Sequence, residues 1–383
     1  MFKYWKDILL SKKPFYYYTI DFEKNFLDKL ICEYDSKDDI NRSYCQYKCF
    51  KKIDNPLKHC LVYCLALLSN PLYVFLLVLR GFFVSKTEKT KENIALDLTP
   101  FNGRFLNDDL KKEFNIKTPR KTSKILTIND LKLIVKIILK FPLAFYFHQK
   151  IINAIAQASY QLKTNACIAV INNREFWFDS SILTHYYESQ NIAHINVMHG
   201  DKLLWFRDSF FRFHRTYVWD EHYINTLTKL HADKKQFIIA ASSELEEIKS
   251  YKNHPHPLDN YTYYLQGDEP VEVLKNIEKE LNKIGKNFIL RPHPRYTQNQ
   301  HELNNEGLRI ENTNVISIID SIKNSEAIIS QYSTVLFQGH LMGKKIILDD
   351  LTNPSLHKKL KERQFLLCSK EHELLSTLIK FQN

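Results

Sequence analysis

A histidine stands between two prolines and two arginines in the segment Arg291-Pro292-His293-Pro294-Arg295, directly after the apolar run NFIL. Proline fixes φ and removes a backbone donor, so we predict a rigid, extended turn at the end of a buried strand. An imidazole flanked by guanidinium groups is suited to bind a diphosphate or a phosphodiester. We therefore predict that Arg291, His293 and Arg295 bind an anionic substrate. A stiff, charged surface loop is the alternative.

A second polar turn, with the sequence SQYST, begins about forty residues further along the chain, after the apolar run AII. Ser333 or Thr334 is expected at the N-terminus of a helix, where hydroxyls and unpaired backbone N–H groups bind phosphate. We predict that Ser330, Ser333 and Thr334 form a second phosphate-binding group, on a strand next to that of the first turn. Ordinary helix capping is the alternative.

A third polar turn, His199-Gly200-Asp201, follows the apolar segment AHINVM. A histidine or a carboxylate at the end of a strand can act as the general base that activates an acceptor hydroxyl, so His199 and Asp201 are candidate catalytic residues. Gly200 permits a tight turn. A purely structural turn is the alternative.

The elements that must position these turns follow a regular order. From about residue 127 onward, short apolar segments alternate with segments of helical periodicity, beginning with a helix capped at Asn129 or Asp130 and ending with one at 371–381. This alternation predicts parallel, doubly wound α/β sheets, which bind ligands at the carboxyl ends of their strands. Because the polar stretch 242–260 interrupts the series, we predict two Rossmann-like domains facing a cleft, at 121–250 and 251–383. Residues 1–120 form a predicted α-rich N-terminal extension.

The N-terminal extension contains one long apolar stretch, residues 60–84. Its length is sufficient to cross a bilayer, but Ser69-Asn70-Pro71 interrupts it and Arg80 lies inside it. We therefore expect a pair of buried core helices or an in-plane membrane anchor, in preference to a transmembrane span.

The charge of the chain favours an anionic partner. Its 383 residues, enough for two domains, include 54 Lys and Arg against 43 Asp and Glu, a formal net charge of +11. The densest basic run, at 111–124, is either a solvated loop or a contact with a membrane surface. No nucleic-acid-binding module is recognisable, so we do not expect nucleic acid as a partner.

Several common sites are missing from the sequence. It lacks the G-x-G-x-x-G, P-loop, H-E-x-x-H and G-x-S-x-G patterns, which argues against dinucleotide-dependent redox chemistry, P-loop phosphoryl transfer and two large hydrolase classes. Cys45, Cys49, Cys60 and Cys64 depart from C-x-x-C spacing, and we interpret them as reduced, partly buried thiols on helix faces. No cofactor or metal is expected. Residues 1–7 lack the features of a signal peptide, so a cytoplasmic location is expected.

The motifs HGD at 199–201, RPHPR at 291–295 and SQYSTVLFQ at 330–338 resemble those of bacterial surface-polysaccharide transferases of the GT-B fold. The His-Pro and Ser-Ser/Thr pair is similar to that of sialyltransferases, polysialyltransferases and Kdo transferases, which use CMP-activated sugars. The His-Gly turn with R-P-H-P and S-x-x-S also resembles the CDP-glycerol glycerophosphotransferases. The resemblance covers about residues 165–350.

The resemblance implies a metal-independent glycosyltransferase that moves a sialic acid- or Kdo-type sugar from a CMP-linked donor to a hydroxyl of a capsule or lipopolysaccharide glycan. His293 would contact the donor phosphate or the cytidine ribose, Ser333 and Thr334 would hold the phosphate, and the His199/Asp201 turn would supply the base. Sialyltransferases often carry an acidic pair before the glycine, where this chain has histidine. The alternatives are a CDP-glycerol- or ribitol-type transferase and a non-catalytic nucleotide- or glycan-binding protein. The expected location is the cytoplasm, at the inner face of the membrane.

Overall fold

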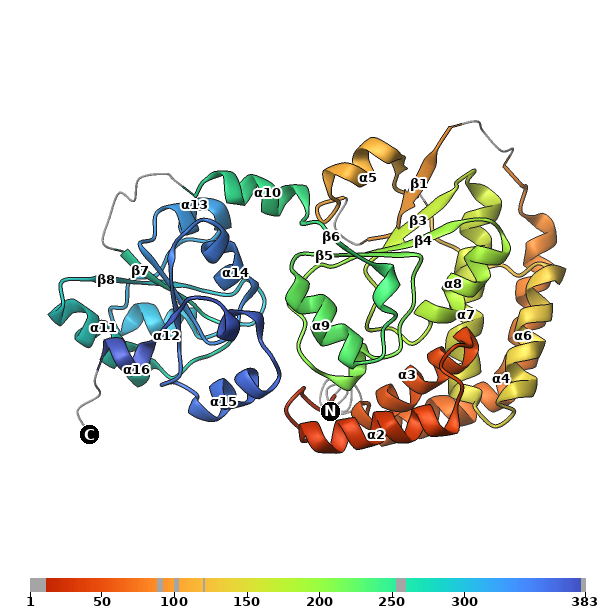
Figure 1. The fold of residues 1–383 in the computed structure, drawn as a ribbon, viewed down its shortest axis with the longest axis horizontal. Helices are drawn as coiled ribbons and strands as arrows, with labels where there is room; N and C mark the ends of the chain where they lie inside the picture. Colours follow the sequence, from red (N-terminus) through yellow and green to blue (C-terminus); the bar gives the residue numbers. More distant parts are fainter. Residues whose placement is uncertain (1–11, 88–91, 100–102, 120, 253–259, 380–383) are drawn as a thin grey trace. The chain divides into compact units, whose positions relative to one another are not determined.

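The chain divides into two compact units in the computed structural model, which describes residues 12–87, 92–99, 103–119, 121–252 and 260–379 (Figure 1). Unit 1 comprises residues 1–199 and 204–242, and unit 2 comprises residues 200–203 and 243–383. The boundary after Ser242 lies at the start of the polar stretch in which we predicted the junction. Residues 1–7, to which the prediction about a signal peptide refers, lie outside the described ranges.

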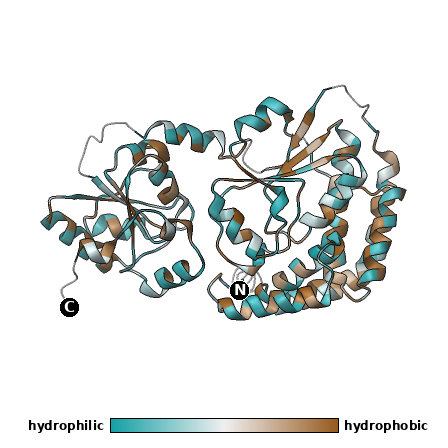
Figure 2. Cartoon of the chain, in the orientation of Figure 1, coloured by the Kyte–Doolittle hydropathy of each residue, from teal (hydrophilic) through white to brown (hydrophobic). Residues whose placement is uncertain are grey.

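Unit 1 is built on a parallel six-stranded sheet in the order β2-β1-β3-β4-β5-β6. Hydrophobic residues lie along its strands (Figure 2), and β1 and β3 are buried along their whole length. Two strands precede residue 121, where the sequence predicted only an extension. The strands are β1 (Ile94–Asp97), β2 (Asn115–Lys117), β3 (Ala169–Asn172), β4 (Ala193–Val197), β5 (Arg215–Val218) and β6 (Phe237–Ile239).

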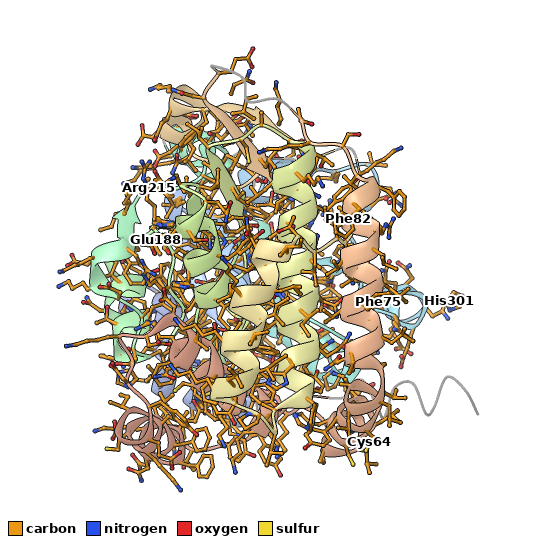
Figure 3. All side chains as sticks on the ribbon, turned by 90° about the vertical axis from the view of Figure 1, so that its right-hand side faces the viewer. Cys64, Phe75, Phe82, Glu188, Arg215 and His301 are labelled. Atoms are coloured by element: carbon orange, nitrogen blue, oxygen red, sulfur yellow. The ribbon has the colours of Figure 1, made fainter. Side chains whose placement is uncertain are left out.

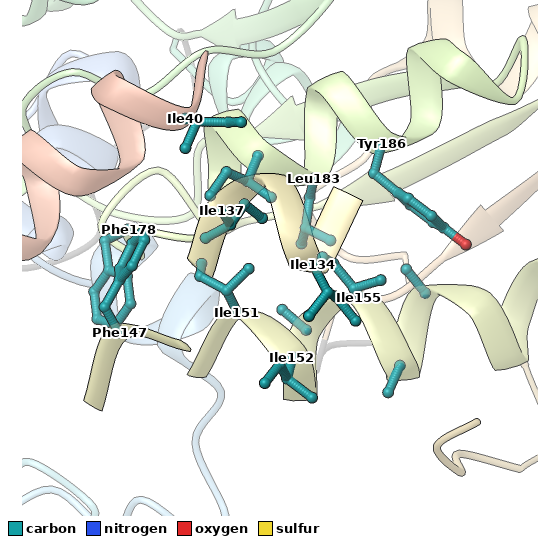
Figure 4. Close-up of a cluster of buried hydrophobic side chains, with 14 of the residues drawn as sticks. Ile40, Ile134, Ile137, Phe147, Ile151, Ile152, Ile155, Phe178, Leu183 and Tyr186 are labelled. Atoms are coloured by element: carbon teal, nitrogen blue, oxygen red, sulfur yellow. The ribbon is translucent and has the colours of Figure 1, made fainter. Parts of the chain in front are cut away.

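Helices are stacked on one another beside this sheet. α8 packs on β4, α7 packs on α8, and α4 and α6 lie on either side of α7 (Figure 3). A cluster of buried side chains that includes Ile134, Phe147 and Leu183 joins them (Figure 4). The helices of unit 1 are α2 (Ile20–Glu33), α3 (Asp39–Ile53), α4 (Pro56–Phe83), α5 (Asp108–Glu113), α6 (Ile128–Lys140), α7 (Phe145–Thr164), α8 (Ser180–Ser189) and α9 (Glu221–Lys229).

Two predictions about these helices were wrong in detail. α6 is capped by Thr127, whose backbone N–H donates to the Asp130 carboxylate at 2.6 Å, so Asp130 is the distal member of a capping box and not the cap itself. The predicted loop at 111–124 contains the end of α5 and the strand β2.

The apolar stretch 60–84 is not broken at Ser69-Asn70-Pro71, contrary to the prediction. α4 is one helix of 28 residues that runs through Pro71. Contacts hold it on both sides of the proline: before it the His59 ring stacks on Tyr146 of α7, and after it Tyr73 Oη donates to Asn153 Oδ1 of α7 at 2.7 Å. It is also not a core helix, since only 11% of its most apolar 18-residue stretch is buried.

Gly81 allows the end of α4 to lie against the chain before α6. A Cβ at this position would be 2.2 Å from the Leu126 carbonyl oxygen. We expect Gly81→Ala to lower the free energy of unfolding by about 1–3 kcal/mol, because the clash outweighs the better helix propensity of alanine. Denaturant unfolding measures this effect. Gly200→Ala is the control, since a Cβ there meets nothing within 4 Å. Equal stability of Gly81→Ala and the wild type would contradict the packing described.

Unit 2 contains a parallel five-stranded sheet in the order β11-β10-β9-β7-β8. Its strands are β7 (Asn260–Tyr264), β8 (Asn287–Arg291), β9 (Ala327–Ser330), β10 (Lys345–Leu348) and β11 (Glu373–Leu374). Its helices are α10 (Ser243–Ser250), α11 (Val271–Lys283), α12 (Gln300–Asn305), α13 (Ile318–Lys323), α14 (Thr334–Leu341), α15 (Pro354–Glu362) and α16 (Leu375–Leu378). The predicted pair of doubly wound α/β domains is thus confirmed.

The predicted terminal helix at 371–381 was wrong. Its first part is the short strand β11, which pairs with Ile347 and Leu348 of β10. The four-residue helix α16 follows it in the described residues, which end at 379, and the Asp350 carboxylate holds Ser376 through its backbone N–H at 2.9 Å and its hydroxyl at 2.6 Å. Pairing with an otherwise open sheet edge therefore prevails over the helical pattern of this segment.

Candidate active site

The polar turns of unit 2 lie along one edge of its sheet. Because all the strands are parallel, the segments that follow β7, β8, β9 and β10 leave the sheet at the same side, where such sheets bind ligands. β7 lies between β8 and β9, so the two turns predicted to bind phosphate are not on neighbouring strands, contrary to the prediction. Two strand spacings of 4.7–4.9 Å separate the strands that carry them by about 10 Å.

His293 is held in one orientation and one tautomer. Its backbone N–H donates to Thr297 Oγ1 at 2.9 Å, and its ring stacks on Tyr296 with the ring centroids 4.4 Å apart. Its Nδ1 accepts the Arg295 backbone N–H at 3.1 Å, so Nε2 carries the proton of the neutral ring. Burial, with Arg295 adding to it, lowers the pKa of His293. His293 thus presents a fixed, neutral Nε2–H donor.

The two arginines of this segment have different environments. Arg291 is buried at the end of β8, where its guanidinium forms an ion pair with Glu311 and donates to the Ile316 carbonyl at 3.0 Å. Arg295 is exposed in the turn, and its backbone positions His293. Arg291 therefore anchors the turn, whereas the charged group of Arg295 is accessible to an anion.

The serine segment places a helix N-terminus on the same edge. Ser333 is the N-cap of α14, as predicted, with its Oγ accepting the Val335 N–H at 3.3 Å, and Thr334 is the first residue of the helix. Both side chains are half-buried. Ser330 is fully buried, and its hydroxyl donates to the Tyr264 carbonyl at 2.7 Å. Ser333 and Thr334 are thus available to a phosphate, while Ser330 holds β9 against β7.

The turn after β7, which sequence reasoning missed, lies between the other two. Asp268 accepts the backbone N–H groups of Gln298 and Asn299 at 2.6 and 3.1 Å and so ties this turn to the His293 segment. Buried Glu269 accepts the backbone N–H groups of Gln266 and Gly267 at 2.7 and 3.3 Å, and burial raises its pKa. A Cβ on Gly267 would meet nothing within 4 Å, so the space above β7 is open. The feature of the sequence that could have identified this turn is the polar Q-G-D-E segment after an apolar strand.

His199 follows β4 in unit 1 and faces a carboxylate that the sequence did not single out. Its Nδ1 lies 3.7 Å from Glu175 Oε1, and its ring lies between the rings of Phe105 and Phe176, with centroids 6.0 and 5.9 Å away. Glu175 is buried, and its backbone carbonyl accepts Gln46 Nε2 at 2.8 Å. A buried carboxylate beside one imidazole nitrogen orients the ring and stabilises its protonated form. The position of Glu175 just after β3 is the feature of the sequence that could have identified it as a candidate site residue.

The other members of the His199 turn are placed differently. Asp201 is half-buried in the short segment 200–203, which groups with unit 2, whereas His199 belongs to unit 1. Gly200, which we expected to permit a tight turn, does not adopt a positive φ, so the backbone here does not require glycine. Glu175 is therefore a carboxylate beside His199 that the sequence prediction did not include.

The cysteines and acidic residues do not gather into a metal site in the described part of the chain, where no group of three or more His, Cys, Asp or Glu side chains could hold an ion. Cys45 and Cys49 are buried on α3, and Cys60 and Cys64 are exposed on α4. The members of each pair thus share a helix, as the spacing predicted, but only the first pair is buried.

No protein-family model and no curated protein matches this chain. Among solved structures it resembles the wall teichoic acid polymerase TagF, with a TM-score of 0.39 and 13% identity over 76% of this chain and 78% of TagF. The UDP-N-acetylglucosamine 2-epimerase from Rickettsia bellii has a TM-score of 0.41 and 11% identity over 67% of this chain and 78% of its own. The Methanocaldococcus jannaschii UDP-GlcNAc 2-epimerase, in complex with UDP-GlcNAc and UDP, has a TM-score of 0.39 and 13% identity over 67% of this chain and 83% of its own. The chain itself consists of two successive parallel α/β units.

Proposed function

We propose that this chain is a transferase that takes a group from a nucleotide-activated donor and passes it to a hydroxyl of a surface glycan. One observation carries the proposal: the His293 Nε2–H donor and the N-terminus of α14 lie on one edge of the unit 2 sheet, on either side of the open turn after β7. Neutral N–H donors and a helix N-terminus favour a phosphate anion. In this proposal unit 2 binds the donor, and His199 is the candidate base.

The chemistry follows from these groups. His199 accepts the proton of the acceptor hydroxyl, and Glu175 stabilises the imidazolium that results. The acceptor oxygen forms a bond to the anomeric carbon of the donor, while the bond from that carbon to the phosphate oxygen breaks and its electron pair leaves with the nucleotide. His293 Nε2–H, Arg295 and the backbone N–H groups at the start of α14 stabilise the charge that develops on the departing phosphate.

The proposed donor is a CMP-linked sugar of the sialic acid or Kdo type, as the His-Pro and Ser-Ser/Thr motifs suggest. A second candidate is a CDP-linked polyol such as glycerol or ribitol. The observation that favours this second donor is that a histidine beside a buried glutamate, and not an acidic pair, stands at the end of β4. With that donor the acceptor oxygen bonds to the β-phosphorus and CMP departs.

Divalent metal is not needed in this proposal, because fixed donors and a helix N-terminus replace it. We expect the rate of nucleotide release in excess EDTA to stay within about twofold of the rate in excess Mg²⁺, since a helix terminus and an Nε2–H donor do not depend on the ion. Loss of turnover in EDTA, restored by Mg²⁺, would contradict the assigned role of His293 and α14.

The test of the function is nucleotide release from a panel of donors. The purified chain is incubated with CMP-sialic acid, CMP-Kdo, CDP-glycerol, CDP-ribitol and UDP-sugars, each with and without an oligosaccharide acceptor. We expect acceptor-dependent release of CMP from one cytidine donor class and none from UDP-sugars. Tight nucleotide binding without release from any donor would instead identify a non-catalytic binding protein.

A further inference from the structure

The outer surface of α4 is a continuous apolar stripe. Its exposed large side chains recur every three or four residues, so they share one side of the helix over about 40 Å at a rise of 1.5 Å per residue. Phe75 and Phe82 lie along this outer side in Figure 3. The stripe consists of Leu57, Leu61, Leu65, Leu68, Leu72, Phe75, Leu76, Leu79, Phe82 and Phe83, all at least 40% exposed.

α6 adds to this apolar surface on the other side of α7. Val135 and Leu139 of α6 and Leu143 just beyond its end are 51%, 74% and 76% exposed. Figure 2 shows the hydrophobic colouring of this helical layer, in which α4 and α6 pack on α7. Exposed apolar surface of this extent marks a binding face and not an ordinary solvated surface.

Polar bonds along its whole length hold α4 on unit 1. Near its start, His59 Nε2 is 2.7 Å from Tyr47 Oη, and its ring stacks on Tyr146. In the middle Tyr73 bonds to Asn153, and near the end Lys163 Nζ donates to the Gly81 carbonyl at 2.8 Å. A helix that crossed a bilayer would have to give up these bonds and carry the polar surface of α7 into hydrocarbon. α4 therefore stays on unit 1, with only its outer stripe available to a partner.

The charge around the stripe identifies its partner. α4 and α7 contain no acidic residue, and the only one in α6 is Asp130, which is buried. Basic residues on these helices are Lys58, Arg80, Lys132, Lys136, Lys140, Lys150 and Lys163, of which Lys58 and Lys140 form ion pairs with Asp54 and Asp38. A second copy of the chain would bring two basic surfaces together. An apolar stripe among lysines instead matches a bilayer with anionic headgroups.

We propose that α4 lies flat at the headgroup–acyl boundary of an anionic membrane, with α6 beside it, and holds unit 1 on the membrane surface without spanning it. This inference does not depend on the donor or on any catalytic residue. It concerns helices that carry none of the candidate site residues, so failure of the proposed function leaves it intact.

The binding test is co-sedimentation of the full chain with vesicles of phosphatidylglycerol or of phosphatidylcholine. We expect strong binding to the anionic vesicles only. Leu68→Glu should lower the partition coefficient by about tenfold or more, because a leucine that is buried in the membrane on binding is lost. Each of Lys132→Glu and Lys136→Glu should lower it by about fivefold or more, because an attraction to the anionic headgroups is lost. The matched control is Val315→Glu in unit 2, since Val315 is 78% exposed and Leu68 is 81% exposed. Equal effects of Leu68→Glu and Val315→Glu, or self-association abolished by Leu68→Glu without vesicle binding, would overturn the proposal.

Depth measurements distinguish a flat helix from a spanning one. Single cysteines introduced by Leu68→Cys or Phe82→Cys carry a fluorophore, with the exposed thiols of Cys32, Cys60 and Cys64 replaced by serine. In a spanning helix these two positions would differ in depth by about 21 Å. We expect both fluorophores to be quenched most by nitroxides near the headgroups, at the same depth. Deep quenching at position 68 with shallow quenching at 82 would show that α4 spans the bilayer and contradict the proposal.

Discussion

His293→Ala is expected to lower kcat for nucleotide release by about 10²–10³-fold, because the departing phosphate loses a fixed N–H donor in the transition state. The donor KM should change less, since Arg295 and the α14 N-terminus remain. His293→Gln should recover part of the loss, because the glutamine amide can donate from a similar position. Steady-state kinetics with the active donor measure kcat and KM for the wild type, His293→Ala and His293→Gln.

The control for this prediction is His301→Ala. His301 is an exposed histidine on α12 of the same unit, hydrogen-bonded to Asn305, and its removal should leave kcat unchanged. The pH profile gives a second check. The pKa of His293 is lowered, so the ring stays neutral as pH rises from 7 to 8, and Nε2–H is present throughout. Loss of activity across that interval in wild type but not in His293→Gln would contradict the assigned donor role.

Glu175→Gln is expected to reduce kcat by about tenfold or more with little change in either KM, and His199→Ala by about 10²–10⁴-fold. In the proposed mechanism the carboxylate 3.7 Å from His199 Nδ1 stabilises the imidazolium, and an amide of the same shape does not carry the charge. In a His199→Ala background, Glu175→Gln should therefore have almost no further effect. This non-additivity separates a positioning role from a structural one.

Glu188→Gln is the matched control, because Glu188 is an exposed glutamate of unit 1 that pairs with Arg212. It should leave kcat unchanged. Thermal unfolding of every variant checks that lost activity is not lost fold, since Glu175 is buried. Full, independent losses from Glu175→Gln in both backgrounds would show that the glutamate does not act through His199.

The sequence predicted the strands β3 to β10, though not β1, β2 or β11, and the reason is physical. AIIS and KIIL are buried on both faces of a parallel sheet, so they appear as continuous apolar runs, and the polar residues after them mark the carboxyl edge. The N-cap role of Ser333 followed from the same local signal. Strand order is not a local property, which is why β7 between β8 and β9 was not predicted.

Other features depended on contacts with distant parts of the chain. Arg291 and Ser330 were predicted to bind substrate, but Glu311 and the Tyr264 carbonyl occupy their polar groups. Pro71 indicated a break in α4, yet contacts of His59 and Tyr73 with α7 hold the helix on both sides of it. Glu175 became recognisable only when the parallel strands β3 and β4 brought it to His199.

The central claim is that the edge formed by the ends of β7, β8 and β9 binds the donor phosphate. A crystal structure of the full chain with CMP bound tests it most directly. We predict phosphate oxygens within about 3.2 Å of His293 Nε2 and of the backbone N–H groups at the start of α14. A nucleotide bound elsewhere, with its phosphate away from both His293 and Ser333, would contradict the account.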